Sequence, residues 1–270
     1  MKKKFLAPAF FLLLGMSMFA YSSSLSAEEK GQTEPTIRLT PGLSHFKALE
    51  CDIPASIIYT QGDHFDLVIE TPIQYEKLLR YMVDADGCLE IESSKNKNNS
   101  WKRIKIYITA PSLEEIELNS AVKFSTQGKV ELSRLNIDAN GACEISIPEI
   151  ACKNLELEIN GASKADINVT QAQRVGIEGN GASKVILNAE SELINIDGEG
   201  TCSFDIIANS KNVMTELSGV CKMTLTTNSE NLFVTTSGVN RVTLLGKTNI
   251  LRLSSGGLSR VNTDGLKTGK

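Results

Sequence analysis

The residues of this chain with the clearest potential for chemistry are carboxylates that recur every 19 or 20 positions. They are Asp138, Glu158, Glu178, Asp197 and Glu216. If the segments between them stack, these side chains form one row. Hard cations such as calcium take carboxylate oxygens as ligands, so the row predicts either calcium binding or contact with a cationic partner. No Asp-Gly-Asp type of calcium loop accompanies the row.

A second, mostly basic set of side chains recurs with the same period, six positions after the acidic one. It consists of Glu144, Lys164, Lys184, Ser203, Lys222, Arg241 and Arg260. The alternative to a binding role is therefore a solvated surface, in which Glu158 faces Lys164, Glu178 faces Lys184 and Glu216 faces Lys222. Exposed pairs of this kind contribute only about 0–1 kcal/mol each.

Between these two sets lies a column of small polar residues and cysteines. It reads Cys143, Ser163, Ser183, Cys202, Cys221, Asn240 and Ser259. Cys202 and Cys221 would be neighbours about 4.8 Å apart, within the Cα range of a disulfide. Parallel side chains suit the disulfide dihedral poorly, so a stack of buried thiols is the alternative. Two other pairings stay open, Cys143 with Cys152 and Cys51 with Cys88, and no metal-binding CxxC motif is present.

Asparagines stand at a further column position, at Asn140, Asn160 and Asn180. Stacked asparagines exchange amide hydrogen bonds along the stack. We expect this column to be structural.

The sequence offers no catalytic constellation. His45 and His64 are the only histidines, and no GxSxG, HExxH, P-loop or dinucleotide fingerprint appears. The repeats resemble one another, whereas an active site needs one repeat to differ. We therefore expect no catalytic residue, no cofactor-binding residue and no cofactor.

Glycines define the period on which all these columns depend. Gly141, Gly161, Gly181, Gly200, Gly219, Gly238 and Gly257 follow one another at spacings of 20, 20, 19, 19, 19 and 19. Apolar residues alternate on both sides of each glycine, which predicts two short strands joined at a corner. Such a period is typical of stacked coils. We predict an all-β fold, a right-handed parallel β-helix or β-solenoid with its repeats at residues 119–262.

The flanking segments lack the period. Residues 43–118 predict a short β-rich segment that caps the first coil, with one short helix between Pro72 and Leu79. Residues 28–42 are expected to be a flexible lead-in, and residues 263–270 a polar tail. Residues 43–262 would then form one domain.

The amino terminus has the pattern of a signal peptide over residues 1–27. Three lysines precede an apolar run from Phe5 to Phe19 and a small-residue cleavage zone. We expect an exported protein that is periplasmic, outer-membrane-associated or secreted, with no transmembrane segment after cleavage. Removing the three lysines moves the formal charge from -4 to about -7, and an acidic surface argues against nucleic-acid binding.

The order of several short motifs resembles one known family. The motifs are FKALECDIPASIIYTQGDHFDLVIE, GCLEIES, KIYITAPSLEEIEL and the ING and GNG coils from Asn140 onward. Together they are similar to the head GIN domain family of auto-transporter adhesins, over nearly all of the chain beyond the signal peptide. The resemblance implies an exported or cell-envelope β-helix protein of the Bacteroidetes type, with an adhesin role and no catalytic residues. The chain departs from the pattern by its three column cysteines and by Ser120-Ala121 at the first corner.

Three functional hypotheses follow. The first is an exported non-enzymatic binding or structural module, an adhesin of the cell surface or envelope whose partner is an envelope or host glycan or protein. The alternative is a carbohydrate-active enzyme, a polysaccharide lyase or hydrolase built on a β-helix. The scarcity of aromatic residues after residue 113 argues against a sugar-stacking groove along the repeats. The third is an envelope scaffold without an extracellular ligand.

Overall fold

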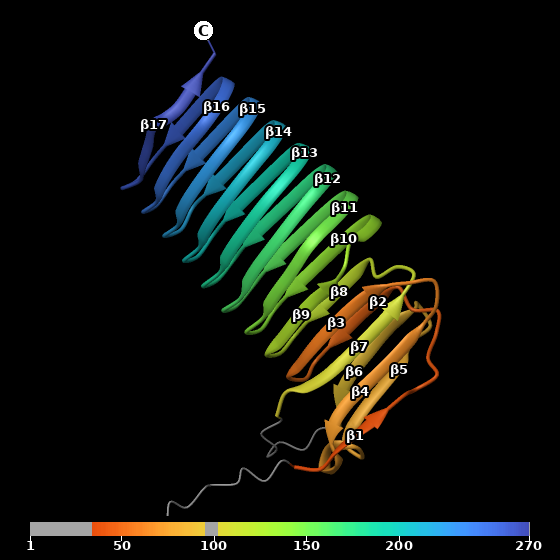
Figure 1. Cartoon of the computed structure of the whole chain (residues 1–270). Coiled ribbons are helices and arrows are strands. Elements are labelled where there is room, and N and C mark those ends of the chain that lie inside the picture. The colour runs from red at the N-terminus through yellow and green to blue at the C-terminus, as the bar shows by residue number, and fades with distance from the viewer. Residues whose placement is uncertain (1–33, 95–101, 270) are drawn as a thin grey trace, which may run out of the picture. The chain divides into compact units, whose positions relative to one another are not determined.

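The computed structural model describes residues 34–94 and 102–269. The predicted signal peptide, residues 1–27, lies outside this part of the chain. The strands of the described residues join into one 17-stranded hydrogen-bonded sheet, which winds into a β-solenoid of about eight turns (Figure 1). The predicted all-β solenoid is confirmed. No helix in the described residues has the length and apolar character needed to cross a membrane.

The repeats form long strands that run from one glycine corner to the next. Their bounds are β10 (Val130–Ala139), β11 (Glu144–Ile159), β12 (Lys164–Gly179), β13 (Lys184–Gly198), β14 (Ser203–Leu217), β15 (Lys222–Thr236), β16 (Arg241–Ser255) and β17 (Arg260–Thr268). Each pairs in parallel with the next.

Each long strand bends so that its two arms face each other across the core. In β13, Val185 and Leu187 on the first arm and Ile194 and Ile196 on the second arm are all at most 1% exposed. Alternation places the intervening side chains outside. One coil alone could not bury these residues, whereas stacked coils form a continuous core.

The period sets the register. Val185 pairs with Phe204, Phe204 with Met223 and Met223 with Val242, each one repeat apart. A register shift between β12 and β13 absorbs the one-residue difference between a 20-residue and a 19-residue coil. The side-chain columns predicted from the glycine spacing therefore exist.

Close backbone contact explains the glycine at each corner. A Cβ atom on Gly219 would lie 2.2 Å from the carbonyl oxygen of Gly200 in the preceding coil. Real Cβ atoms do not approach that closely, so a side chain would push the coils apart. At the first corner, where the sequence has no glycine, Ser120 takes the place of the lower residue and Gly141 stacks on it.

The segment before the repeats is built from shorter elements. These are β1 (Thr36–Leu39), β2 (Ala48–Cys51), β3 (Ala55–Gln61), β4 (Asp66–Pro72), the 3₁₀ helix η1 (Ile73–Tyr75), β5 (Leu79–Val83), β6 (Cys88–Ser93), β7 (Ile104–Ala110), β8 (Glu115–Leu118) and β9 (Val122–Gln127).

These elements do not stack in chain order. β2 pairs in parallel with both β6 and β8, and β3 pairs in parallel with both β7 and β9. The coil made by β2 and β3 therefore lies between two coils that come later in the sequence (Figure 1). β4 and β5 close the edge by antiparallel pairing with β7 and β6, and β1 pairs with β4. The amino-terminal segment thus supplies coils of the solenoid as well as strands that cover its end.

Three local predictions need correction. Thr36–Leu39, placed in the flexible lead-in, forms β1, because its backbone pairs with β4. The polar tail is part of β17, because parallel pairing with β16 uses backbone groups and needs no apolar side chains. The short helix expected between Pro72 and Leu79 reduces to the three residues of η1.

Substituting a corner glycine tests the close approach. We expect Gly219→Ala to lower the free energy of unfolding by about 1–3 kcal/mol, because the new Cβ forces neighbouring coils apart. Gly42→Ala is the matched control, since no atom lies within 4 Å of the added Cβ. Its effect should stay within about 0.5 kcal/mol. Urea unfolding followed by circular dichroism measures both, and equal stability of the two variants would contradict the packing argument.

Candidate functional site

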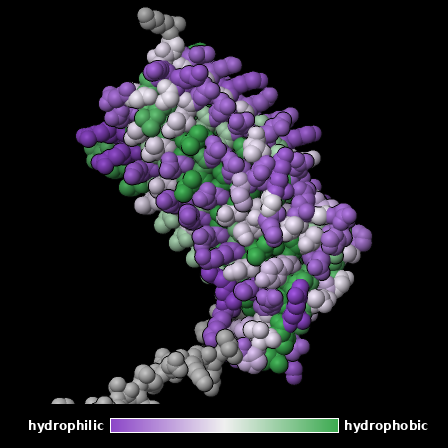
Figure 2. All heavy atoms as spheres, in the orientation of Figure 1, coloured by the Kyte–Doolittle hydropathy of each residue, from purple (hydrophilic) through white to green (hydrophobic). Residues whose placement is uncertain are grey.

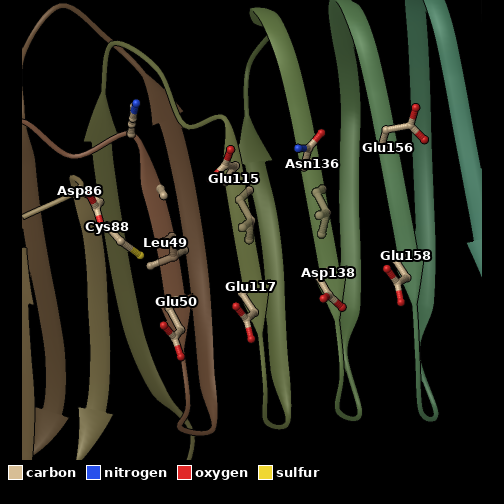
Figure 3. Close-up of a pocket in the computed structure, with 14 residues that line it drawn as sticks. Leu49, Glu50, Asp86, Cys88, Glu115, Glu117, Asn136, Asp138, Glu156 and Glu158 are labelled. Atoms are coloured by element: carbon tan, nitrogen blue, oxygen red, sulfur yellow. The ribbon is translucent and has the colours of Figure 1, made fainter. Parts of the chain in front are cut away.

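A row of carboxylates, here named the acidic row, runs across one face of the solenoid. Eight acidic side chains occupy one register position in eight neighbouring strands. In spatial order they are Glu90, Glu50, Glu117, Asp138, Glu158, Glu178, Asp197 and Glu216. At about 4.8 Å per strand the row is roughly 34 Å long. Figure 3 shows Glu50, Glu117, Asp138 and Glu158 side by side on four strands.

The sequence predicted five of these eight positions and missed the first three. Glu90, Glu50 and Glu117 belong to strands β6, β2 and β8, whose spacing does not follow the repeat. The sequence pattern that could have identified them lies in their immediate neighbours. Each stands between two residues of the solenoid core, as in Leu89-Glu90-Ile91, the pattern that also surrounds Glu158.

Asparagines support the row from the adjacent column. The amide of Asn160 donates to Glu158 at 2.9 Å and to Asn140 at 2.9 Å, and Asn180 donates to Asn160 at 3.1 Å. The predicted asparagine ladder is confirmed, and it begins one coil earlier, at Asn119. Asn180 has a buried side-chain oxygen without a donor, since Glu199 occupies the column in the next coil. The ladder therefore holds part of the row in a defined orientation.

The acidic row has no ion-pair partner within 4.0 Å in the part of the chain that the structure describes. The interpretation that Glu158, Glu178 and Glu216 pair with lysines across the corner is wrong. The acidic and basic columns lie on opposite arms of the coil, and the outer faces of these arms point away from each other.

Three members of the acidic row, Glu50, Asp138 and Asp197, have raised pKa values, chiefly through burial and further through neighbouring carboxylates. Burial raises the pKa of Asp197, and the neighbouring carboxylates of Glu216 and Glu178 raise it further. Burial and Glu158 do the same to the pKa of Asp138. For Glu50, burial is again the main cause of a raised pKa, followed by the charges of nearby carboxylates. Ionisation of these three carboxylates thus costs free energy in the folded protein.

The row borders two hollows in the surface. The larger has a volume of about 460 Å³ and its lining includes Glu50, Glu115, Glu117 and Asp138. A second parallel line of polar groups, Glu115, Asn136 and Glu156, rims this hollow (Figure 3). The hollow therefore has carboxylates around an apolar floor that includes Leu49, Ile116 and Ile137.

The smaller hollow, of about 240 Å³, adjoins the larger and shares Glu156 and Glu158 with it. Here Glu156 accepts a hydrogen bond from Arg174 at 3.1 Å. The carboxylate of Glu156 occupies the space above Gly176, where a Cβ would clash with it. Arg174 thus neutralises one carboxylate beside the row, as Arg134 does through its ion pairs with Glu114 and Glu115.

The described residues contain no group of three or more His, Cys, Asp or Glu side chains placed to hold a metal ion. The acidic row supplies one carboxylate per strand, so its members do not converge on a point. Calcium binding at Asp138, Glu158, Glu178, Asp197 or Glu216 stays a prediction. A rise in melting temperature in millimolar calcium would be its signature.

The cysteine column is a buried hydrogen-bond ladder. The backbone N–H of Cys143 donates to Ser163 Oγ at 2.9 Å, and that of Cys221 donates to Asn240 Oδ1 at 2.9 Å. Such side chains satisfy backbone groups of the coil below, whereas Ser183 Oγ is buried without a hydrogen-bond partner.

All six cysteines are free thiols in the structure. Burial raises the pKa of Cys51 to about 12, and contact with the Cys202 thiol raises that of Cys221. A thiol with a raised pKa is a poor nucleophile. The Cys202–Cys221 disulfide stays a prediction, which mass spectrometry of the unreduced protein checks.

Neither histidine lines the acidic hollows. His45 is exposed and contacts Ser44 at 2.8 Å, and His64 is exposed and contacts Asp63 at 2.9 Å. Both hydrogen bonds are with the preceding residue, and the ring of His45 also lies 5.7 Å from the ring of Phe65.

The fold and the surface define a parallel β-solenoid with an acidic face. The sequence from residue 45 to 203 matches the family model described as "Putative auto-transporter adhesin, head GIN domain". The chain belongs to this family. No functionally curated protein matches the sequence.

Solved structures share the fold at low sequence identity. A putative adhesin from Bacteroides fragilis is 21% identical, with a TM-score of 0.63 over 85% of this chain and 97% of that one. A putative adhesin from Parabacteroides distasonis is 14% identical, with a TM-score of 0.72 over 85% and 98%. A putative lipid binding protein from the same species is 15% identical, with a TM-score of 0.70 over 86% and 97%.

The raised pKa of Asp197 predicts that its negative charge lowers the stability of the folded protein near neutral pH. Because folding raises the pKa of Asp197, the folded state binds its proton more tightly than the unfolded chain does. This contribution to stability is present below the unfolded pKa and is lost as the pH rises through the folded pKa. Asp197→Asn should therefore raise the melting temperature near neutral pH, and the gain should disappear at about pH 4.

Glu144→Gln is the control of opposite sign. Its pairing with Lys123 lowers the pKa of Glu144, so this group stabilises the protein above its unfolded pKa and loses the effect as the pH falls. The substitution should lower the melting temperature near neutral pH. Calorimetry across the pH range checks both, and a destabilised Asp197→Asn would contradict the account of repulsion.

Proposed function

We propose that this protein is a non-enzymatic adhesin-type module of the cell surface or envelope, which binds a cationic segment of a partner protein along the acidic row. Membership of the adhesin family supports a binding role at or beyond the envelope. The names of the solved relatives, two putative adhesins and one putative lipid binding protein, also describe binding rather than turnover.

The unneutralised row is the observation that carries the proposal. Like charges held at strand spacing repel, and after burial the repulsion from neighbouring carboxylates is the second cause of the raised pKa values of Glu50, Asp138 and Asp197. An extended partner with lysine or arginine side chains would relieve it. The hydrogen bonds from Asn119, Asn160 and Asn180 orient three of the carboxylates beforehand, which reduces the entropy lost on binding.

The same geometry argues against catalysis. Acid–base work needs groups with different tasks at one place, whereas the acidic row repeats one group across successive coils. The lining of the two acidic hollows includes no histidine or aromatic side chain. The polysaccharide lyase or hydrolase hypothesis therefore finds no distinguished site on this face.

A binding experiment tests the acidic row. Polylysine and arrays of matrix proteins and envelope polysaccharides serve as ligands for the purified protein, at low and at high ionic strength. We expect binding to polylysine and to basic proteins that weakens with salt. Glu158→Gln, Glu178→Gln and Glu216→Gln combined should weaken this binding by about tenfold, since each exposed contact contributes up to about 1 kcal/mol.

The matched control removes three charges elsewhere. Glu131, Glu144 and Glu192 are each paired with a lysine and lie outside the row, so their combined change to glutamine should leave binding nearly unchanged. Equal losses in both triple variants would contradict the row as the binding surface. Release of new reducing ends or unsaturated products from a polysaccharide would overturn the non-enzymatic assignment.

A further inference from the structure

A different surface lies on the other side of the glycine corner, in the last three coils. Val220, Val239 and Leu258 follow the corner glycines at equivalent positions and are 56%, 50% and 81% exposed. With Lys222, Arg241 and Arg260 they line a hollow of about 550 Å³. We call these six residues the corner strip. Figure 2 shows hydrophobic groups exposed among hydrophilic ones on one face of the molecule.

The cations of the corner strip stand in register. Lys222 pairs with Arg241, and Arg241 pairs with Arg260, so their backbones lie about 4.8 Å apart. The row continues past Ser203 to Lys184 and Lys164, over a length of roughly 24 Å. None of these five cations forms an ion pair within the described part of the chain.

Neutral side chains surround the corner strip. The outward positions on its two sides are Ser218, Ser237 and Gly256, and Thr224, Thr243 and Asn262. The nearest acidic residues along the corner, Glu199 and Asp205, belong to the preceding coil, where Ser203 interrupts the cations. Positive charge and exposed aliphatic surface therefore coincide, and the one carboxylate in these coils on that side, Asp264, lies beyond Asn262, from which it accepts a hydrogen bond at 3.2 Å.

We propose that the corner strip binds the surface of a membrane that contains anionic lipids. Val220, Val239 and Leu258 would enter the boundary between headgroups and acyl chains, while Lys222, Arg241 and Arg260 meet the lipid phosphates. Basic residues beside exposed aliphatic side chains are the combination that holds peripheral proteins at such surfaces.

Other occupants fit the strip less well. A free phosphate would use the cations and leave the aliphatic side chains in water. Single-stranded nucleic acid requires aromatic side chains on which its bases stack, and the lining of the strip includes none. A second copy of the strip would bring like charges together.

This proposal goes beyond the adhesin function and does not depend on it. The acidic row and the corner strip lie on opposite arms of the coil. An anionic membrane attracts the strip and repels the row, so bound protein would present its carboxylates to the solution.

Vesicle flotation tests the proposal, and it uses the protein as it is purified from the cells that express it. The vesicles are pure phosphatidylcholine or an equal mixture of phosphatidylcholine and phosphatidylglycerol. We expect binding to the mixture that salt weakens, with little binding to the neutral vesicles. Lys222→Gln, Arg241→Gln and Arg260→Gln combined should weaken binding by about 100-fold, at about fivefold for each cation.

A second variant tests the aliphatic contacts. Val220→Ser, Val239→Ser and Leu258→Ser combined should weaken binding by about tenfold or more, because less apolar surface enters the membrane. The control, Glu158→Gln, Glu178→Gln and Glu216→Gln, should bind at least as well as the unchanged protein. Circular dichroism melting shows whether each variant is folded.

Four results would overturn the proposal. They are equal binding to neutral vesicles, no binding to anionic vesicles, undiminished binding of the folded cation variant, and undiminished binding of the folded aliphatic variant. If soluble glycerol phosphate also displaces the protein, the last result would identify the strip as a site for free anions.

Discussion

Each coil must approach its neighbour to one strand spacing at the corner, and the rest of the structure depends on that contact. There the carbonyl oxygen of Gly200 occupies the space that a Cβ on Gly219 would need. Backbone N–H groups bond to the coil below throughout this turn, as from Val220 to Gly200 at 2.7 Å. A coil displaced by one residue would lose these bonds and turn its apolar side chains outward. The corner therefore holds the register of every column.

Register converts a repeated sequence into surfaces of uniform chemistry. A single carboxylate would be an ordinary exposed residue, but eight carboxylates in register produce a continuous negative electrostatic potential along one face. The two arms then separate the signs of charge, since the acidic and basic columns flank the same corner and face away from each other. Hydrogen-bond ladders of asparagine and of small polar residues run between them and satisfy most of the amide and backbone groups that the stack brings together, Asn180 Oδ1 being an exception.

The glycine spacing was sufficient to predict the solenoid, its columns and five members of the acidic row. Nothing in that spacing shows how β2 comes to lie between β6 and β8, because strand order depends on contacts between residues far apart in sequence. Three carboxylates were missed for this reason. The sequence showed the sign of each charge but not the direction in which each arm faces. Because the acidic and basic arms face away from each other, the ion pairs expected across the corner do not form.

Some features follow from packing between particular side chains. The ring of Phe204 lies 2.8 to 3.1 Å from where Cβ atoms on Gly198 and Gly179 would stand. Gly198 ends the strand just before the corner that leads to Phe204, and Gly179 is its partner in the preceding coil. A search for a repeated motif sees them only as irregularities in an apolar column, yet they provide the room that one large ring requires.

The order of the first strands also makes the two ends of the stack unequal. β17 pairs with β16 alone, so its removal breaks one interface. β2 and β3 are held between segments synthesised after them, and β4 and β5 close the coil beyond. Within the described residues, β17 separates from the stack when one strand interface breaks, whereas β2 and β3 separate only when two interfaces break. Local opening and proteolysis should therefore reach β17 before they reach β2 and β3.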